Sequence, residues 1–364
     1  MRPTDDRASG TIAPGGPLVS VIIPAWRAED HIAAAVRSAL DQSLDDLEVL
    51  VVDDASPDRT AAVVERLALL DPRVRLVRGG WNRGPAGARN LGLAAARGAW
   101  IALLDADDAY EPGRLETLVN FARVADADMV ADNLLLEEGG DGDGDRGGGD
   151  GRPVIQPMIP AALLPAPQVV DTARFLEGNL PVRDHPRVSY GFLKPVFRRS
   201  FLARHGLRYD EGARFAEDFL FYTSALLAGA RFWLLPQALY RYRVRGDSLT
   251  AAHDAGDLHR LLTAAAPLYQ NPQVRQDKRL RAAVARHRRS IERRLAWRLF
   301  TDALKAGRPG AALAAAAGPS QAWHIAGECL RALPRVLARL RAGGGVVPRP
   351  VPSADSPGIP APRG

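Results

Sequence analysis

The chain has 364 residues, of which 46% are hydrophobic and 25% are charged, and its formal net charge is +6. These values are ordinary for a globular protein, and the length accommodates one large domain with an appendage or two domains. The single cysteine, Cys329, excludes an intramolecular disulfide and a zinc site built from cysteines, and it fits a reducing compartment. No run of about 18 apolar residues occurs, so we expect no membrane-spanning helix.

The first part of the chain alternates between strand-like and helix-like segments. Residues 1–16 are polar and rich in glycine and proline, and we expect a flexible leader there. Short apolar runs predict strands at residues 19–24, 47–52, 74–77 and 100–104. Helical spacing predicts helices at residues 32–40 and 60–70, and a glycine-rich turn at residues 82–90 leads into a further helix that ends at Ala96. This β-α-β alternation predicts an α/β fold with a mainly parallel sheet and helices on both faces.

The pattern is less regular beyond residue 110. We expect a helix over residues 112–124, a strand over 129–132 and a disordered Gly/Asp-rich insertion over 138–152. Residues 190–197 predict a kinked strand, and 215–227 a helix. Short strands are predicted at 231–235 and 239–242. One domain should therefore span residues 17–250, followed by a helical extension over 251–342 and a disordered Pro/Gly-rich tail over 343–364.

Carboxylates gather where the predicted strands end. Asp105, Asp107 and Asp108 follow the strand at 100–104, and Asp53 and Asp54 follow the strand at 47–52. Ligands of such sheets bind beyond the carboxyl ends of the strands. Clustered carboxylates repel one another unless a cation or a hydrogen-bonding ligand offsets the repulsion. These positions are therefore candidate ligand-binding residues.

The usual phosphate-binding glycine loops are missing. The turn after the first strand, residues 24–29, has no glycine, and no Gly-x-x-x-x-Gly-Lys-Ser/Thr sequence occurs. If a nucleotide binds, a divalent cation is the natural substitute for backbone amides, and Asp105 and Asp107 are the natural residues to hold it. Oxygen ligands favour Mg²⁺ or Mn²⁺, completed by phosphate oxygens and water. Such an ion would stabilise a nucleoside diphosphate as a leaving group.

Transfer of a group to a hydroxyl also requires a general base. Glu217 and Asp218, at the start of a predicted helix, are the best candidates. The competing interpretation is that this acidic pair only caps the helix.

Four motifs together resemble family 2 glycosyltransferases, which are inverting enzymes of the GT-A fold. They occupy residues 19–26, 51–58, 84–90 and 104–108, in the order and at about the spacing of that family. The later motifs at Lys194-Pro195, Glu217-Asp218 and residues 240–243 are similar to the bacterial exopolysaccharide branch, such as succinoglycan-type glucosyltransferases. The resemblance covers about residues 17–250.

The resemblance implies roles for individual residues. Asp54 would recognise the base with Asp53 beside it, and Arg89 would lie near the base or the ribose. Asp105 would contact the ribose side and serve as a secondary metal ligand, and Asp107 would bind the metal and the diphosphate. The remaining residues expected to line the nucleotide pocket are Pro24, Ala25 and Glu29. Asp218 would be the catalytic base.

Other charged residues have two interpretations each. Arg243 and Arg245 would either contact the diphosphate or form a solvated strand edge. Lys194 would either face the acceptor or pair with an acidic residue. Glu217 is assigned with them as a candidate diphosphate or acceptor contact.

The appendage is strongly basic. Residues 251–364 contain 19 basic and 7 acidic residues, so the first 250 residues carry a net negative charge. The arginines would either form a solvated helix face or contact anionic lipids, with the chain cytoplasmic or peripheral at the inner face of the plasma membrane. Nucleic-acid binding is not supported, because aromatic residues are not interleaved with the basic ones.

The sequence therefore predicts a metal-dependent, inverting glycosyltransferase. It would move a single sugar from a nucleotide donor, with UDP the expected nucleotide, to a hydroxyl of a growing glycan that can be lipid-linked. No Gln-x-x-Arg-Trp motif of processive synthases occurs. The alternatives are a non-catalytic nucleotide-sugar or glycan-binding module with the same fold, and a nucleotidyltransferase, for which a glycine-rich activating loop is absent.

Overall fold

The computed structural model describes residues 16–138, 154–180, 188–213, 215–244, 254–318 and 321–330. The expected leader, insertion and tail therefore fall outside the described residues, except for Gly16 and Glu138. The chain divides into two compact units, residues up to Leu295 and residues from Ala296. The candidate site belongs entirely to the first unit.

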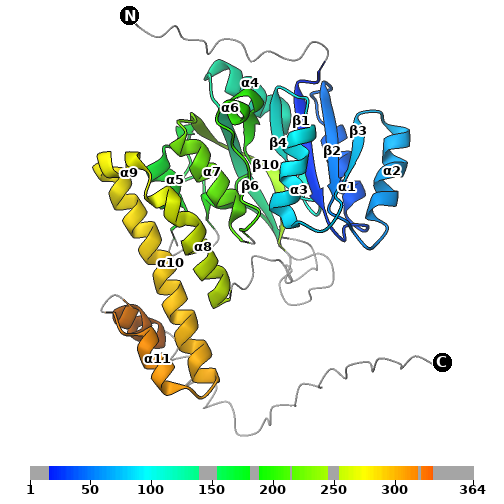
Figure 1. The fold of residues 1–364 in the computed structure, drawn as a ribbon. Helices are drawn as coiled ribbons and strands as arrows, with labels where there is room; N and C mark the ends of the chain where they lie inside the picture. Colours follow the sequence, from blue (N-terminus) through cyan, green and yellow to red (C-terminus); the bar gives the residue numbers. More distant parts are fainter. Residues whose placement is uncertain are drawn as a thin grey trace, which may run out of the picture. The chain divides into compact units, whose positions relative to one another are not determined.

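Four parallel strands form one half of the central sheet (Figure 1). They lie in the order β3-β2-β1-β4. Their bounds are β1 Val19–Ala25, β2 Leu47–Asp53, β3 Val74–Arg78 and β4 Trp100–Leu103. Every residue of β2 and β4 is buried, as expected for strands covered on both faces. The parallel sheet predicted from the apolar runs is confirmed.

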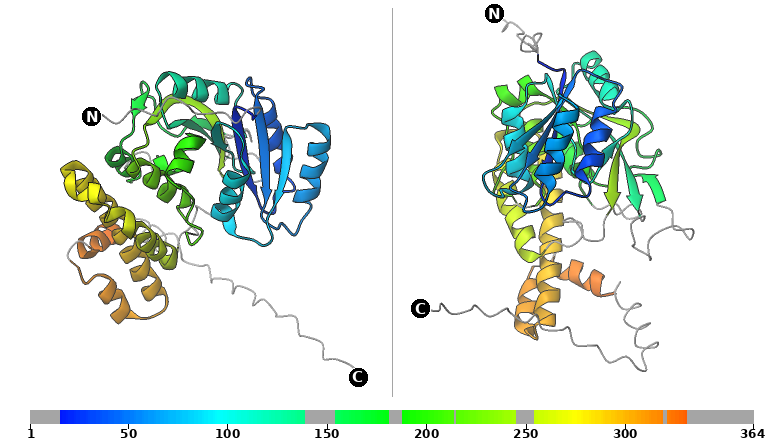
Figure 2. Two further views of the ribbon diagram at one scale, coloured as in Figure 1. Left: turned by 45° about the horizontal axis from the view of Figure 1, so that its top comes forward. Right: turned by 90° about the vertical axis from the view of Figure 1, so that its right-hand side faces the viewer.

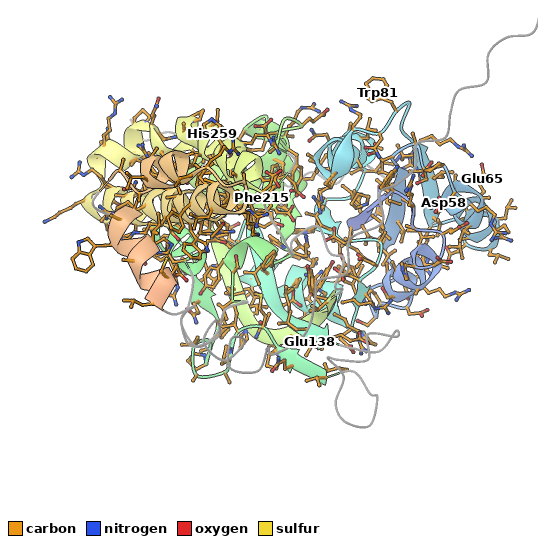
Figure 3. The ribbon with its side chains drawn as sticks, turned by 90° about the horizontal axis from the view of Figure 1, so that it is seen from below. Asp58, Glu65, Trp81, Glu138, Phe215 and His259 are labelled. Carbon is orange, nitrogen blue, oxygen red and sulfur yellow. The ribbon has the colours of Figure 1, made fainter. Side chains whose placement is uncertain are left out.

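Helices cover both faces of this half-sheet. Figure 2 (right) shows α1, Ile32–Leu40, and α3, Gly84–Ala95, on opposite sides of the strands. The helix α2, Thr60–Leu70, lies beside the edge strand β3 and buries only Thr60 and Val64. Asp58 lies just before this helix, and its Oδ1 accepts a hydrogen bond from the Thr60 amide at 3.1 Å. Figure 3 places Asp58 and Glu65 at this side of the molecule.

The other half of the sheet mixes directions. Strand β4 is followed across the sheet by β9, β6, β10 and β5, with β9 antiparallel to both β4 and β6. The two short strands β7 and β8 pair with β6 and β10. The bounds are β5 Ala109–Tyr110, β6 Met129–Glu138, β7 Val154–Pro157, β8 Gln168–Val169, β9 Val196–Arg198 and β10 Phe232–Val244.

Two local predictions in this half are wrong. Residues 190–197 do not form one kinked strand, because Tyr190–Phe192 is a 3-10 turn and only Val196–Arg198 is extended. Asn179 stabilises that turn, since its Oδ1 accepts from the Gly191 amide at 2.7 Å. The two strands predicted at 231–235 and 239–242 are one strand, β10, which continues past Pro236 through two register shifts against β6.

The remaining helices lie between the later strands or follow β10. They are α4 Arg114–Val124, α5 Thr172–Gly178, α6 Arg199–Arg204 and α7 Glu217–Leu227. The later helices are α8 Ala255–Tyr269, α9 Pro272–Gln276, α10 Lys278–Lys305 and α11 Pro309–Ala315. Within the described parts of the chain, none of the helices combines the length and apolar character needed to cross a membrane.

Candidate active site

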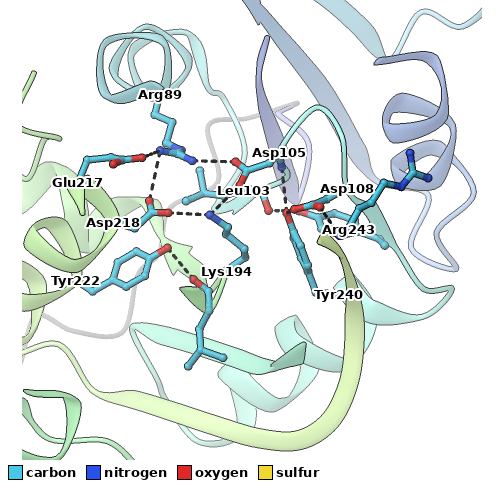
Figure 4. A network of polar contacts seen from close by, with 12 residues as sticks. Arg89, Leu103, Asp105, Asp108, Lys194, Glu217, Asp218, Tyr222, Tyr240 and Arg243 are labelled. Atoms are coloured by element: carbon cyan, nitrogen blue, oxygen red, sulfur yellow. Dashed lines mark hydrogen bonds and ion pairs between the residues drawn. The ribbon is translucent and has the colours of Figure 1, made fainter. Parts of the chain in front are cut away.

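The site lies where β4 ends and α7 begins (Figure 4). Two cations hold three carboxylates there. Lys194 Nζ is 2.9 Å from Asp105 Oδ2 and 2.7 Å from Asp218 Oδ2. Arg89 donates to Asp105 Oδ1 at 2.8 Å and to Glu217 Oε1 at 2.7 Å. The structure thus brings together five residues that the sequence singled out from four separate segments.

The cations are more deeply buried than the carboxylates. The side chains of Arg89 and Lys194 are 4% and 5% exposed, whereas those of Asp218 and Asp105 are 10% and 23% exposed. A ligand that approaches from solvent therefore meets the carboxylates first. This placement makes direct contact between Lys194 and a diphosphate or an acceptor less favourable than the sequence suggested.

Nearby charged groups determine the protonation states of Asp105 and Lys194. Burial alone would raise the pKa of Asp105, but Lys194 and Arg89 outweigh it and hold that pKa well below its ordinary value. Burial lowers the pKa of Lys194, yet Asp105 and Asp218 more than offset this effect, and the pKa lies above its ordinary value. Asp105 is therefore a carboxylate and Lys194 an ammonium throughout the neutral pH range.

The backbone beside the acidic pair is in an unusual conformation. Ala216, which precedes Glu217, has φ 58° and ψ 29°, the left-handed region that residues with a Cβ rarely adopt. Such strain persists only where surrounding contacts impose it, and it clusters at functional sites. Both acidic residues occupy the first turn of α7, where the helix dipole favours negative charge. The helix start and the ion pairs together orient the pair.

Asp107 and Asp108 differ in their surroundings. Asp107 is half-buried on the loop that follows β4. Asp108 is buried, its Oδ2 accepts from the Tyr240 hydroxyl at 2.7 Å, and its Oδ1 accepts from the Arg243 amide at 2.9 Å. Burial, and then repulsion by Asp105 and Asp107, raises the pKa of Asp108 well above its ordinary value. Asp108 therefore ties the loop to β10.

The residues predicted for the nucleotide pocket lie at the ends of β1 and β2. Pro24 and Ala25 end β1 and pair with Val52 and Asp53 of β2. The buried Asp53 caps the following turn through a 3.3 Å hydrogen bond from the Ser56 amide.

The other two predicted pocket residues, Asp54 and Glu29, hold backbone amides. Asp54 accepts from the amides of Arg83, at 2.9 Å and 3.0 Å, and of Gly84, at 2.8 Å, and thereby caps α3. Glu29 accepts from the Arg59 amide at 3.1 Å. The carboxylates at this end of the sheet thus organise the loops that would surround a nucleotide.

Two aromatic side chains stand exposed near these loops. Trp26 is 48% exposed, and the Arg27 guanidinium lies 4.6 Å from the centre of its ring. Trp81 is 67% exposed, and Figure 3 shows it pointing outward.

The two arginines predicted at the end of β10 have different outcomes. The Arg243 amide binds Asp108, and in the view of Figure 4 its side chain extends away from the Arg89 and Lys194 network. Arg245 lies outside the described residues. The structure thus brings Asp105, Lys194, Glu217 and Asp218 together with Arg89 but does not join Arg243 to them.

Three residues of the site were not identified from the sequence. Tyr240 accepts from the Asp105 amide at 3.1 Å, Tyr209 is buried beside the Asp218 carboxylate, and Arg114 supports the segment that carries Lys194. Their neighbours come from distant parts of the chain, so no local spacing indicates them. The one available signal was the aromatic and basic run at residues 240–243.

The mixed sheet with helices on both faces is similar to the sheets of GT-A glycosyltransferase structures. A crystal structure of residues 1–349 of TarS from S. aureus in complex with UDP superimposes with a TM-score of 0.57 at 19% identity, over 85% of this chain and 91% of that one. The mannosyltransferase PcManGT from Pyrobaculum calidifontis, in complex with GDP-Man and Mn²⁺, gives a TM-score of 0.52 at 21% identity, over 90% of this chain and 84% of that one. At these identities the similarity establishes the fold.

Sequence comparison defines the family. Residues 20–163 match the model of glycosyl transferase family 2. The succinoglycan biosynthesis protein ExoU of Rhizobium meliloti is 38% identical over 78% of this chain and 78% of its own length. ExoO of the same organism, another succinoglycan biosynthesis protein, is 40% identical over 64% of this chain and 63% of its own length. The chain belongs to glycosyltransferase family 2 and is a glycosyltransferase.

Proposed function

We propose that this glycosyltransferase moves one sugar from a nucleotide-diphosphate donor, with UDP the expected nucleotide, to a hydroxyl of a growing exopolysaccharide. The observation that carries the proposal is the pairing of the strand-end carboxylate Asp105 with the acidic pair at the start of α7 through Lys194 and Arg89. This pairing supports a site in which the donor lies on the Asp105 side of the network and the acceptor on the Asp218 side. The names of ExoU and ExoO support the assignment to polysaccharide biosynthesis.

The donor class has independent support. Structural neighbours are complexes with UDP, with UDP-GlcNAc and with GDP-Man. In this chain the hydrogen bonds from the Arg83 and Gly84 amides to Asp54 support a preformed pocket beside the loops after β1 and β2. A nucleoside would lie against these loops, and its diphosphate would extend toward Asp107.

The carboxylates fit a divalent cation that shares its coordination with the donor. Within the described residues no three His, Cys, Asp or Glu side chains are arranged to enclose a metal ion by themselves. Mg²⁺ and Mn²⁺ bound to nucleotides need only one or two carboxylates, because phosphate oxygens and water complete the shell. Asp107 is the residue that we assign to the ion, with Asp105 secondary because both of its oxygens contact cations. The ion would supply positive charge beside the departing diphosphate.

Asp218 is the proposed general base. Its side chain is 10% exposed, with Oδ1 buried, and the network fixes its position beside the end of β4. In the proposed step Asp218 takes the hydroxyl proton while the acceptor oxygen forms a bond to the anomeric carbon. The bond from that carbon to the diphosphate oxygen breaks, and the diphosphate keeps the electron pair. One displacement inverts the anomeric configuration.

The basic helices support a contact with anionic lipid. Helices α8, α9 and the beginning of α10 line a groove of about 580 Å³, whose apolar wall includes Leu262 and Val284 and whose rim includes Arg275 and Arg281. Within the second unit, large apolar side chains are exposed at Leu299, Leu304, Leu313 and Trp323. Apolar groups combined with arginines are typical of peripheral binding to anionic membranes. A lipid-linked acceptor would be presented where either unit contacts the membrane.

A donor panel tests the proposal. UDP or GDP release is measured from a set of nucleotide sugars, with simple glycosides as acceptors, in Mn²⁺ and in EDTA. We expect Mn²⁺-dependent release from one UDP-sugar. Binding of UDP without any release would instead indicate a non-catalytic module, and pyrophosphate release from a nucleoside triphosphate would indicate a nucleotidyltransferase. Equal release in EDTA would contradict the metal assignment.

A further inference from the structure

We propose that Lys194 is a positioning residue that holds the base Asp218 at a fixed place relative to the donor-side carboxylate Asp105. The inference rests on the proposed function, in which these two carboxylates serve the acceptor and the donor. Lys194 Nζ donates a hydrogen bond to Asp218 Oδ2 at 2.7 Å. The same ammonium contacts Asp105 at 2.9 Å.

Arg89 does not replace Lys194 in this role. Its guanidinium is committed to Asp105 and Glu217, and its Nη1 is 3.6 Å from Asp218 Oδ1, beyond hydrogen-bond distance. The Tyr209 hydroxyl is a further neighbour of the Asp218 carboxylate, but it carries no charge. Lys194 is therefore the cation that hydrogen-bonds Asp218, and Arg89 is the cation that hydrogen-bonds Glu217.

The backbone around Lys194 is held from two sides. The Leu193 carbonyl accepts from the Tyr222 hydroxyl of α7 at 2.9 Å, and the Lys194 carbonyl accepts from the Arg114 guanidinium of α4 at 2.5 Å. Pro195, which follows, has a fixed φ. The ammonium thus extends from a rigid segment, which is what a side chain that positions another requires.

Arg114 is itself fixed. Both the Arg114 and the Asp132 side chains are fully buried, and they form a forked ion pair with a shortest distance of 2.7 Å. The Arg114 guanidinium lies 4.5 Å from the centre of the Tyr110 ring and 5.1 Å from that of Tyr240. Since Tyr240 also binds the Asp105 amide, the supports of Lys194 and of Asp105 are joined.

Net stability alone does not explain why Lys194 is buried between Asp105 and Asp218. Buried ion pairs often contribute little net stability, because desolvation offsets the attraction, but the removal of one partner leaves an uncompensated charge. Lys194 is 4% exposed and lies behind the carboxylates, so it is poorly placed to contact substrate. An ammonium at this place serves to hold two carboxylates close together that would otherwise repel each other.

The test compares Lys194→Met with Arg198→Met. Arg198 is a matched control, because it lies on the adjoining strand β9 and also contacts two carboxylates, Asp126 at 3.0 Å and Asp128 at 3.3 Å, away from the site. We expect Lys194→Met to lower kcat by about 100-fold, the scale of a misplaced base, with UDP affinity within about threefold of wild type. Arg198→Met should lower the thermal midpoint and leave kcat unchanged.

Three results would overturn the role: an unchanged kcat in Lys194→Met, a loss of UDP affinity as large as the loss in kcat, or an equal fall in kcat in Arg198→Met. If Lys194→Met does not fold, Lys194→Gln, which keeps two N–H donors, is measured against the same control.

A stability cycle separates this proposal from the proposed function, because it needs no turnover. Unfolding midpoints are measured for Lys194→Met, Asp218→Asn and the double variant. We expect the double variant to be more stable than Lys194→Met, since Asp218→Asn removes a buried carboxylate that has lost its hydrogen-bonded cation. Strictly additive changes would refute the direct bridge, even in a protein for which no donor had been found. Absence of transfer from every donor, with the coupling intact, would refute only the proposed function.

Discussion

Arg89 and Glu217 are separated by 128 positions in the sequence, yet Arg89 Nη1 lies 2.7 Å from Glu217 Oε1. The same guanidinium reaches Asp105, so one arginine on α3 joins the end of β4 to the start of α7. A planar guanidinium can donate to two carboxylates at once, which an ammonium on a flexible stem does with less directional control. The site is therefore sensitive to the shape of this cation as well as to its charge.

Arg89→Lys should impair both activity and stability. A lysine ammonium can hydrogen-bond only some of the carboxylates that Arg89 binds. A buried carboxylate therefore loses its partner. We expect kcat to fall at least about 100-fold and the free energy of unfolding to fall by about 3 kcal/mol. Urea unfolding and steady-state kinetics check the two effects. Retention of wild-type values in both would show that charge alone suffices at this position.

Asp218→Asn should remove the base while leaving donor binding nearly intact. General-base contributions are commonly about 10²- to 10⁴-fold, and we expect a loss of kcat in this range. Calorimetric titration with UDP and Mn²⁺ measures donor binding in the same protein. Glu217→Gln is the neighbouring control and should lose less activity, because Glu217 pairs with Arg89. Full turnover by Asp218→Asn would remove Asp218 from the mechanism.

Asp107→Asn and Asp108→Asn should differ sharply. Asp108 has a raised pKa and accepts one hydrogen bond at each oxygen, and an asparagine can preserve the contact with the Arg243 amide. We expect Asp108→Asn to keep kcat within about threefold and Asp107→Asn to lose at least about 100-fold, with a higher Mn²⁺ requirement. Mn²⁺ titrations of initial rate distinguish the two. Similar losses in both variants would assign Asp108 to the metal as well.

His287 should make stability depend on pH. It is 5% exposed, and its ring stacks on Phe219 with centroids 4.6 Å apart. Burial, and then Arg294, lower the pKa of His287 from 6.5 to about 4. The unfolded chain therefore binds a proton that the folded protein does not between these values. The contribution of neutral His287 to the free energy of unfolding is therefore fully present above pH 6.5. About 3 kcal/mol of it is lost as the pH falls toward 4.

The comparison of wild type with His287→Asn isolates this effect. Unfolding in urea is measured at several pH values between 4 and 7. The variant should lose less stability than wild type as the pH falls through this range. Parallel curves for the two proteins would show that His287 is not the responsible group.

Local pattern was enough for the first half of the fold and not for the second. Strands β1, β2 and β4 are buried on both faces and are therefore mainly apolar, which the sequence displays directly. The two-residue strand β5 and the turn Tyr190–Phe192 depend on partners far away, namely β10 and Asn179. No periodicity within such a short segment can indicate them.

Likewise, some residues of the candidate site can be predicted from the local sequence and others cannot. The sequence identified Asp105, Asp107 and Asp218 because carboxylates at element boundaries stand out locally. Two interpretations of Lys194, an acceptor contact and an ion pair, stayed open. The choice between them depends on burial and on Arg114, which is 80 positions away. The contact with two carboxylates at once could be found only from the assembled sheet. Metal binding by Asp107 and catalysis by Asp218 stay predictions.

The position of β9 has a consequence for synthesis on the ribosome. Strands β4 and β6 are complete by Glu138, but the strand that lies between them, β9, begins only at Val196. During this interval the nascent chain has two parallel strand edges that lack their shared neighbour. Lys194 lies two residues before β9 in the chain. The cation that joins Asp105 to Asp218 is therefore synthesised immediately before the strand that fills the gap in the sheet. The sheet and the ion-pair network can be completed at the same stage of translation.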